Sequence, residues 1–107
     1  MTGPKFFAEA LAEYEDAVAD YEQRKEGLGA RLIEELDQAL AVVLSFPEAF
    51  AVIPDVPPDL GLRSILLRTF PIKLVYTVLD DALLVVAVFH ARRRPGYWLE
   101  RLKRFGK

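Results

Sequence analysis

Residues 62–90 read LRSILLRTFPIKLVYTVLDDALLVVAVFH, a run dominated by aliphatic and β-branched side chains. Two short breaks, Phe70-Pro71 and Asp80-Asp81-Ala82, divide the run into segments of strand length. We therefore expect strands at Leu62–Thr69, Ile72–Leu79 and Leu83–His90. Links this short make consecutive strands antiparallel neighbours. The third segment is apolar at both alternating positions, which predicts a central strand covered on both faces.

Upstream of this run, apolar residues recur at helical spacing. Leu11, Tyr14, Val18 and Tyr21 form one stripe, so a first helix is expected from about Ala8. Gly27-Leu28-Gly29 ends that helix, and a second helix follows until about Ser45, because Pro47 disfavours helix at Phe46. The apolar face of the second helix comprises Leu28, Leu32, Leu36, Ala39, Leu40 and Val43. The short link makes the two helices an antiparallel hairpin.

The remaining segments complete an α+β architecture. We expect a short first strand at Lys5–Phe7, a proline-bearing loop over residues 46–61, and a short terminal helix at Tyr97–Phe105. The predicted fold is an N-terminal antiparallel helical hairpin packed on a small antiparallel sheet, with a short C-terminal helix. A chain of 107 residues is expected to form one domain, spanning residues 1–107.

Charge is divided unevenly along the chain. Residues 1–59 hold 13 acidic and 4 basic side chains, a balance of −9, whereas residues 60–107 hold 3 acidic and 10 basic ones, a balance of +7. This asymmetry indicates a surface that faces an anionic partner. The acids of the first helix are interpreted as a solvated surface: Glu9, Glu13, Glu15, Asp16, Asp20 and Glu22.

Composition excludes several classes of site. The chain has no cysteine and one histidine, so neither disulfides nor a zinc site of the usual kinds is expected, and no cofactor is predicted. The N-terminus lacks a basic segment followed by a long apolar run, so no signal peptide is expected. The longest apolar run, Ala82–Phe89, is too short to span a bilayer. We expect a cytoplasmic protein without membrane contact.

One constellation remains as a candidate for chemistry. His90 ends the third predicted strand, and Ala91-Arg92-Arg93-Arg94 follows it. Arginine grips phosphate bidentately and aromatic rings stack on bases, so we predict a phosphate-binding or target-binding edge. It would comprise Arg63, Arg68, Arg93, Arg94 and Trp98. Metal-free RNA cleavage needs an acid–base group and cations. His90 or Tyr97 would supply the first, and Arg92 or Lys73 the second.

Each of these residues also has a purely structural interpretation. His90 would cap the strand end through a backbone hydrogen bond. Tyr97 and Trp98 would anchor the last helix to the core, the interpretation favoured for this pair. Arg92–Arg94 would be an ordinary exposed turn. The residues alone leave these alternatives open.

The colinear set of segments resembles the RelE/ParE superfamily of type II toxins over nearly the whole chain. The residues that carry the resemblance are Ala10 to Tyr21 with Gly27-Leu28-Gly29, Phe46-Pro47, Arg68-Thr69-Phe70-Pro71 leading to Leu74-Val75-Tyr76, and His90-Ala91-Arg92-Arg93 with Pro95, Tyr97-Trp98 and Arg101. The resemblance implies a growth-inhibiting toxin silenced by a cognate antitoxin. In RelE-like members the toxin cuts mRNA in the ribosome, whereas ParE-like members poison DNA gyrase.

The resemblance also implies site residues. For a RelE-like nuclease, the catalytic pattern falls near Lys73, Arg92 and Tyr97, but the lysines that such nucleases carry around the first strand of the sheet are missing. The pI of about 5.4 is also unusual for a protein that enters a polyanion field. Both features favour the ParE-like hypothesis, with the RelE-like nuclease as the alternative. A third hypothesis is an inactive member that only binds its antitoxin.

The antitoxin is expected to cover apolar surface. The stripes of the helical hairpin and the sheet edges exceed what so small a chain buries by itself. We therefore predict that an antitoxin segment lies across these surfaces as a strand or a helix.

Overall fold

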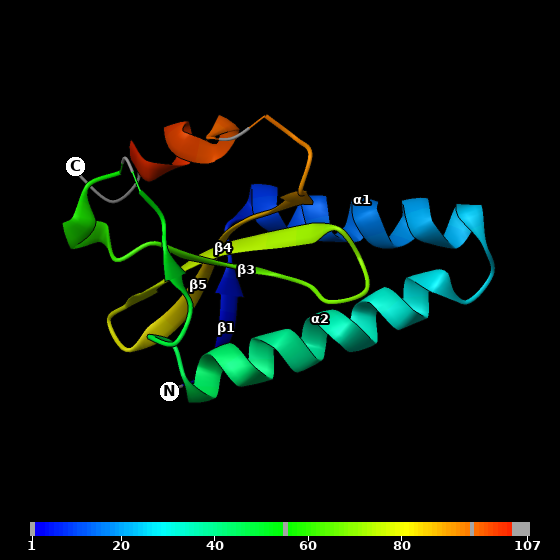
Figure 1. Cartoon of the computed structure of the whole chain (residues 1–107), viewed down its shortest axis with the longest axis horizontal. Helices are drawn as coiled ribbons and strands as arrows, with labels where there is room; N and C mark the ends of the chain where they lie inside the picture. Colours follow the sequence, from blue (N-terminus) through cyan, green and yellow to red (C-terminus); the bar gives the residue numbers. More distant parts are fainter. Residues whose placement is uncertain (1, 55, 95, 104–107) are drawn as a thin grey trace.

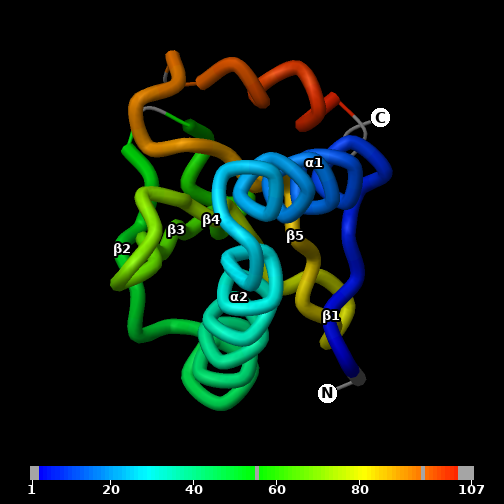
Figure 2. The backbone as a smooth tube through the Cα atoms, turned by 90° about the vertical axis from the view of Figure 1, so that its right-hand side faces the viewer, coloured from blue at the N-terminus to red at the C-terminus, as the bar shows by residue number. Residues whose placement is uncertain are grey.

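The computed structural model describes residues 2–54, 56–94 and 96–103. Two helices, α1 (Ala8–Arg24) and α2 (Leu28–Ser45), pack on one face of a five-stranded sheet. The strands are β1 (Thr2–Phe6), β2 (Ala51–Val52), β3 (Arg63–Leu66), β4 (Ile72–Leu79) and β5 (Ala82–His90), in the spatial order β1-β5-β4-β3-β2. Figure 1 shows α1 and α2 running in opposite directions below the C-terminal segment. Figure 2 shows α1 lying between α2 and that segment.

The turn between the helices explains their close approach. Gly27 has a φ of 91°, a left-handed conformation that favours glycine. Its N–H and that of Gly29 donate to the carboxylate of Glu22, at 3.0 and 2.8 Å. A Cβ at Gly29 would lie 3.0 Å from the carbonyl oxygen of Val18, so the backbones meet where a side chain has no room. The predicted helical hairpin is confirmed.

The main core lies between the helices and the face of the sheet that they cover, here called the helix face. Leu32, Leu36 and Val43 are fully buried there, as the apolar stripe of α2 predicts. They pack with Leu74 on β4 and Val85 on β5, among others. Sheet and helices therefore bury each other's apolar surface, which neither could do alone.

The sheet is mixed rather than antiparallel throughout, which corrects the prediction. The pairings β3–β4 and β4–β5 are antiparallel as expected, but β1 runs parallel to β5. Both helices lie between β1 and the rest of the sheet in sequence, and this long connection is what permits a parallel pairing. β5 lies inside the sheet between β1 and β4, so its predicted central position is confirmed.

Several segment boundaries also differ from the prediction. β1 covers Thr2–Phe6 rather than Lys5–Phe7. The residues 46–61 include the two-residue edge strand β2 and a 3₁₀ turn, η1 (Pro58–Leu60), so this segment is not entirely loop. β3 ends at Leu66, because Leu67 N–H already donates to the carbonyl of Ile72 across the turn. The terminal segment contains a 3₁₀ helix, η2 (Tyr97–Leu102), and the predicted end of the helix at Phe105 lies outside the described residues.

A bulge in β5 creates a second core on the far face of the sheet, opposite the helices. The β4–β5 register shifts so that Val75 pairs with Ala87 and Tyr76 with Val85, which leaves Val86 as the extra residue. The second cluster consists of Leu62, Val75, Val86, Ala87, Phe89 and Trp98. Through it η2 is packed against the far face, beside the end of β5.

The β4–β5 hairpin yields a first prediction. Asp80 and Asp81 both have positive φ, 52° and 62°, as a two-residue type I′ turn requires. Replacing Asp81 with glycine is expected to raise the free energy of unfolding by about 0.5 kcal/mol, since glycine adopts this conformation without steric cost. Asp81→Val should lower it by about 1 kcal/mol or more. Urea unfolding of both variants would measure the difference, and a stable valine variant would contradict this account of the turn.

Candidate functional site

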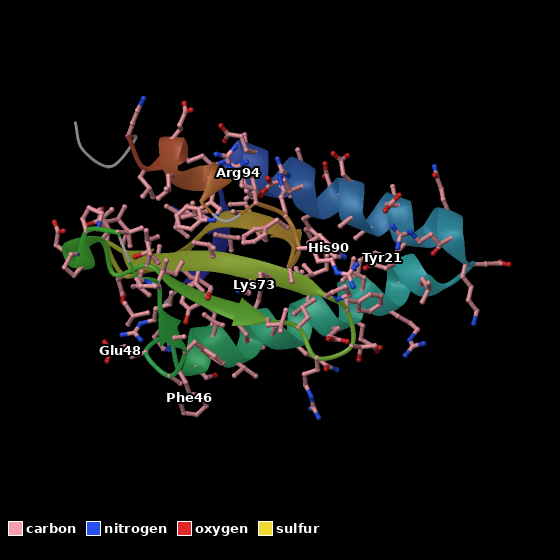
Figure 3. The ribbon with its side chains drawn as sticks, turned by 45° about the horizontal axis from the view of Figure 1, so that its top comes forward. Tyr21, Phe46, Glu48, Lys73, His90 and Arg94 are labelled. Atoms are coloured by element: carbon pink, nitrogen blue, oxygen red, sulfur yellow. The ribbon has the colours of Figure 1, made fainter. Side chains whose placement is uncertain are left out.

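His90 lies at the exposed end of β5 and faces a hollow beside α1. Its Nδ1 accepts a hydrogen bond from the N–H of Arg92, at 3.1 Å, so the imidazole caps the strand end. The hollow has a volume of about 370 Å³ and is lined by Asp16, Asp20 and Tyr21, among others. Figure 3 shows His90 next to Tyr21. His90 pairs with Ile72, the neighbour of Lys73, and strand alternation places the side chains of His90 and Lys73 on opposite faces of the sheet.

The densest set of polar contacts is centred on Glu13 of α1. Its carboxylate accepts hydrogen bonds from both terminal nitrogens of Arg101 (2.8 and 2.9 Å), from the hydroxyl of Tyr97 (2.5 Å) and from the N–H of Val88 (3.0 Å). Arg93 lies 3.7 Å from the same carboxylate, and its guanidinium stacks 3.6 Å above the ring of Tyr97. We call these five residues the Glu13 cluster. It joins α1, β5 and η2.

Burial and hydrogen bonding fix the protonation states in the Glu13 cluster. Burial acts to raise the pKa of Glu13, but the hydrogen bonds from Arg101, Tyr97 and Val88 outweigh it and hold the pKa below its usual value. Burial, followed by the hydrogen bond to Glu13, raises the pKa of Tyr97 well above its usual range. Tyr97 therefore stays protonated near neutral pH and donates a hydrogen bond to Glu13, so its phenolate form is not available as a general base.

The lowered pKa of Glu13 predicts a loss of stability in acid. A carboxyl group whose pKa is lower in the folded state stabilises the fold above its unfolded pKa, near 4.5, and loses that contribution as pH falls through the folded pKa. The pKa of Glu22, lowered by the N–H groups of Gly27 and Gly29, acts in the same direction. So does the pKa of Glu35, where burial acts to raise it but hydrogen bonds, chiefly from Thr69, outweigh burial. Urea midpoints of the wild type and Glu13→Gln, measured from pH 7 to pH 3, should converge below pH 4.5. A constant difference across that range would show that Glu13 is not linked to the acid transition.

Lys73 and Arg93 share a groove on the far face of the sheet. The groove has a volume of about 490 Å³ and lies between residues 51–54 with Val56 on one side and residues that follow β5 on the other. Its lining includes Ser64, Lys73, Phe89, Arg93 and Trp98. Trp98 is only 4% exposed and packs into the second core, while Tyr97 contacts Phe89 edge to face. Both rings therefore anchor η2, as favoured from the sequence, and the ring of Trp98 is not presented for base stacking.

The other predicted cations are scattered, so the expected single basic edge is not formed. Strand alternation places Arg63 on the helix face, where its guanidinium donates to the carbonyl of Phe50 at 2.6 Å. Arg68 lies beside α2 in a hollow that also includes Glu34 and Glu35. Arg92 and Arg94 are exposed after β5, and Figure 3 shows Arg94 well separated from Lys73. The groove on the far face brings together Lys73, Arg93 and Trp98, and the hollow beside α1 brings together His90 and Arg93.

The prediction that all the acids of α1 form a solvated surface is wrong for Glu13, whose side chain is 15% exposed. A signal for it exists in the sequence: Ala10, Glu13 and Ala17 have spacings of three and four, so Glu13 shares a helix face with small residues. Small neighbours leave room for another segment to approach, and a carboxylate on such a face requires partners. The residues alone give no signal for Arg101, which is part of the family resemblance only. Its pairing with Glu13 joins residues 88 positions apart in the sequence.

Within residues 2–54, 56–94 and 96–103, no group of three or more histidine, aspartate or glutamate side chains is placed to hold a metal ion. No helix in the described part of the chain is long and apolar enough to cross a membrane.

The helical hairpin on a mixed sheet and the segment after β5 define a toxin fold of the RelE/ParE superfamily. The chain of a chromosomal ParDE toxin–antitoxin system from P. aeruginosa superposes with a TM-score of 0.65 at 18% identity, over 84% of this chain and 96% of that one. Isolated E. coli RelE superposes with a TM-score of 0.59 at 30% identity, over 98% and 99%. A chain of the intact E. coli RelBE toxin–antitoxin complex superposes with a TM-score of 0.59 at 30% identity, over 87% of this chain and 100% of that one. No curated protein is similar enough in sequence to match.

The model of the ParE toxin family of type II toxin–antitoxin systems matches residues 5–95. The chain belongs to this family, and it is therefore a toxin of the type II class.

Proposed function

We propose that this toxin inhibits growth by poisoning DNA gyrase and is neutralised by a cognate antitoxin. The observation that carries the proposal is the Glu13 cluster. Tyr97 is the candidate for the acid or base of a nuclease, but its hydroxyl donates a hydrogen bond to Glu13. The Glu13 carboxylate also accepts hydrogen bonds from Arg101 and forms an ion pair with Arg93. A nuclease without metal needs such groups free to meet RNA, whereas a toxin that binds a protein does not.

A RelE-like activity on mRNA is the second candidate. Two observations favour it: the 30% identity to E. coli RelE and the groove that Lys73 and Arg93 share. In that case Lys73 and Arg92 would supply the cations, and His90 or Tyr97 the acid or base. Of the candidate residues, Lys73, Arg93 and Trp98 line this groove. His90, Arg92 and Tyr97 do not line it, and neither do Arg63, Arg68 and Arg94, so all six would contact RNA outside it.

Exposed apolar residues support the antitoxin as a partner. Val42 and Phe46 at the end of α2 are 47% and 63% exposed, and Val52 in the edge strand β2 is 56% exposed. A free strand edge next to apolar side chains is a surface on which a peptide can add as a strand or lie as a helix. RelE is known in complex with its antitoxin in the intact E. coli RelBE structure, which is a precedent for such a partner.

Purified toxin distinguishes the candidates directly. We expect it to inhibit supercoiling by gyrase in vitro and to leave mRNA on translating ribosomes uncut. The matched variants are Lys73→Ala and Arg92→Ala. Both should inhibit gyrase as the wild type does, because these two residues are candidates only for the RNA-cleavage mechanism. Codon-positioned mRNA cuts that disappear in Arg92→Ala would establish the RelE-like alternative. A toxin with neither effect, and no growth defect on controlled expression, would be an inactive member.

A further inference from the structure

The groove on the far face of the sheet has a cationic end and an apolar end. Lys73 lies at the start of β4 beside the end of β5, and Arg93 follows β5. Ile53 lies toward the other end, because its N–H donates to the carbonyl of Leu62, which precedes β3. β3 begins opposite Tyr76, so the two ends are separated by roughly 10 Å along β4.

The charged side chains that line the groove, in the described part of the chain, are both cations. Arg93 lies 3.7 Å from Glu13, which does not line the groove, so its charge is partly matched within the chain. Lys73 is half-buried and makes no ion pair or side-chain hydrogen bond with any described residue. Its ammonium group is therefore the charge available to a ligand. Asp55, next in sequence to two lining residues, lies outside the described residues and is varied in the test.

The rest of the lining suits a hydrocarbon tail better than a peptide. Apart from the two cations, the polar side-chain groups among the described lining residues are the Ser64 hydroxyl and the Trp98 indole. Peptide N–H and C=O groups buried there would have few partners, which is costly, whereas a hydrocarbon tail needs none. The volume of about 490 Å³ falls within the range of small-molecule sites.

We propose that the groove binds an amphipathic carboxylate, a small molecule with its anionic head at Lys73 and Arg93 and its apolar tail directed toward Ile53. The head accepts charge-assisted hydrogen bonds, and the tail removes apolar surface from water. A bound tail contacts both walls of the groove, residues 51–54 and Leu99, and so holds η2 against the sheet. This site goes beyond the proposed action on gyrase and does not depend on it.

The test compares octanoate, octanol and octylammonium, which share one tail and differ in the charge of the head. Each is titrated into the full-length protein, and binding is followed by the emission of Trp98, the one tryptophan of the chain, which lines the groove. We expect octanoate to bind about fivefold tighter than octanol, and octylammonium to bind most weakly. Across butanoate, hexanoate and octanoate, affinity should rise about two- to fourfold per methylene. The amide resonance of Ser64 should shift with the same saturation, and that of Gly27 should not.

Reversing the charge of Lys73 gives the sharpest variant. Lys73→Glu should weaken octanoate about tenfold and make octylammonium the preferred probe. Lys73→Gln should reduce the preference for octanoate over octanol and keep the dependence on tail length, and it replaces the first variant if that one does not fold. The matched control is Lys5→Glu on β1, at the opposite edge of the sheet, which makes the same change in net charge and should bind as the wild type does.

Two further arms exclude an internal partner and a protein ligand. Asp55→Asn should bind octanoate at least as tightly as the wild type does. If only Asp55→Asn prefers octanoate to octanol, Lys73 is already neutralised within the chain and the inference fails. An acetylated Ala-Val-Leu tripeptide with a free carboxylate that binds tighter than octanoate, with the same dependence on Lys73, would assign the groove to a protein C-terminus instead.

Three results of the main titration would also overturn the inference. These are the absence of saturable binding of octanoate, equal binding of octanoate and octanol to the wild type, and an equal loss of octanoate affinity in Lys73→Glu and Lys5→Glu.

Discussion

Glu13→Ala is expected to lower the free energy of unfolding by about 3 kcal/mol, because it leaves Arg101 poorly solvated and without its partner. The guanidinium of Arg101 is 13% exposed and would lose both hydrogen bonds to the Glu13 carboxylate, while keeping the one to the carbonyl of Val86 at 3.0 Å. The N–H of Val88 and the hydroxyl of Tyr97 would lose their acceptor in the same substitution. Urea unfolding followed by circular dichroism measures the effect.

The control for this prediction is Glu15→Ala, an exposed acid two positions away in α1, whose effect should stay within about 0.5 kcal/mol. A double-mutant cycle between Glu13→Ala and Arg101→Met isolates the pair, with an expected coupling of about 1–3 kcal/mol. If both single variants cost less than about 0.5 kcal/mol, the Glu13 cluster contributes little to holding η2 against α1.

The elements predicted most accurately are those whose pattern is local. The β4–β5 hairpin follows from two apolar segments separated by Asp80 and Asp81, residues that tolerate the positive φ the turn needs. The helices follow from apolar residues at spacings of three and four, which become the buried stripe of Leu32 and Leu36.

The direction of β1 and the existence of β2 were not predictable in the same way. The five residues of β1 carry no information about which strand they pair with, and parallel or antiparallel pairing is set by the intervening chain. β2 has two residues, both exposed, so burial leaves no alternation in its sequence. Pairing with Arg63 and Ser64 of β3 defines it instead.

The sequence predicts which types of residue the candidate site contains, but not where in the fold each side chain lies. Sequence order brings His90 and Arg92–Arg94 together, but the bulge at Val86 and the turn after β5 decide which side chains reach which face. Arg63 and Lys73 therefore lie on opposite faces of neighbouring strands. The pairing of Glu13 with a residue 88 positions away depends on the packing of η2 and is not visible in any local pattern.

Trp98→Ala is expected to be the most damaging substitution of a predicted target-binding residue, with a loss of about 3–5 kcal/mol of unfolding free energy. Trp98 is 4% exposed and packs with Phe89 and Val86 in the second core, so truncation would leave a cavity beneath η2. Trp98→Phe keeps most of the apolar volume and should lose less than half as much. Thermal unfolding by circular dichroism measures both, since the chain has one tryptophan and the variants lack its fluorescence.

The same pair of variants separates packing from recognition for Trp98. If the ring acts only through packing, Trp98→Phe should inhibit the target as well as the wild type does below its own Tm, and Trp98→Ala should lose activity in proportion to the fraction unfolded. The opposite pattern would be a stable Trp98→Ala variant that has lost target inhibition. That result would mean that the indole leaves the core to contact the target, because a side chain that contributes only to recognition does not determine the free energy of unfolding.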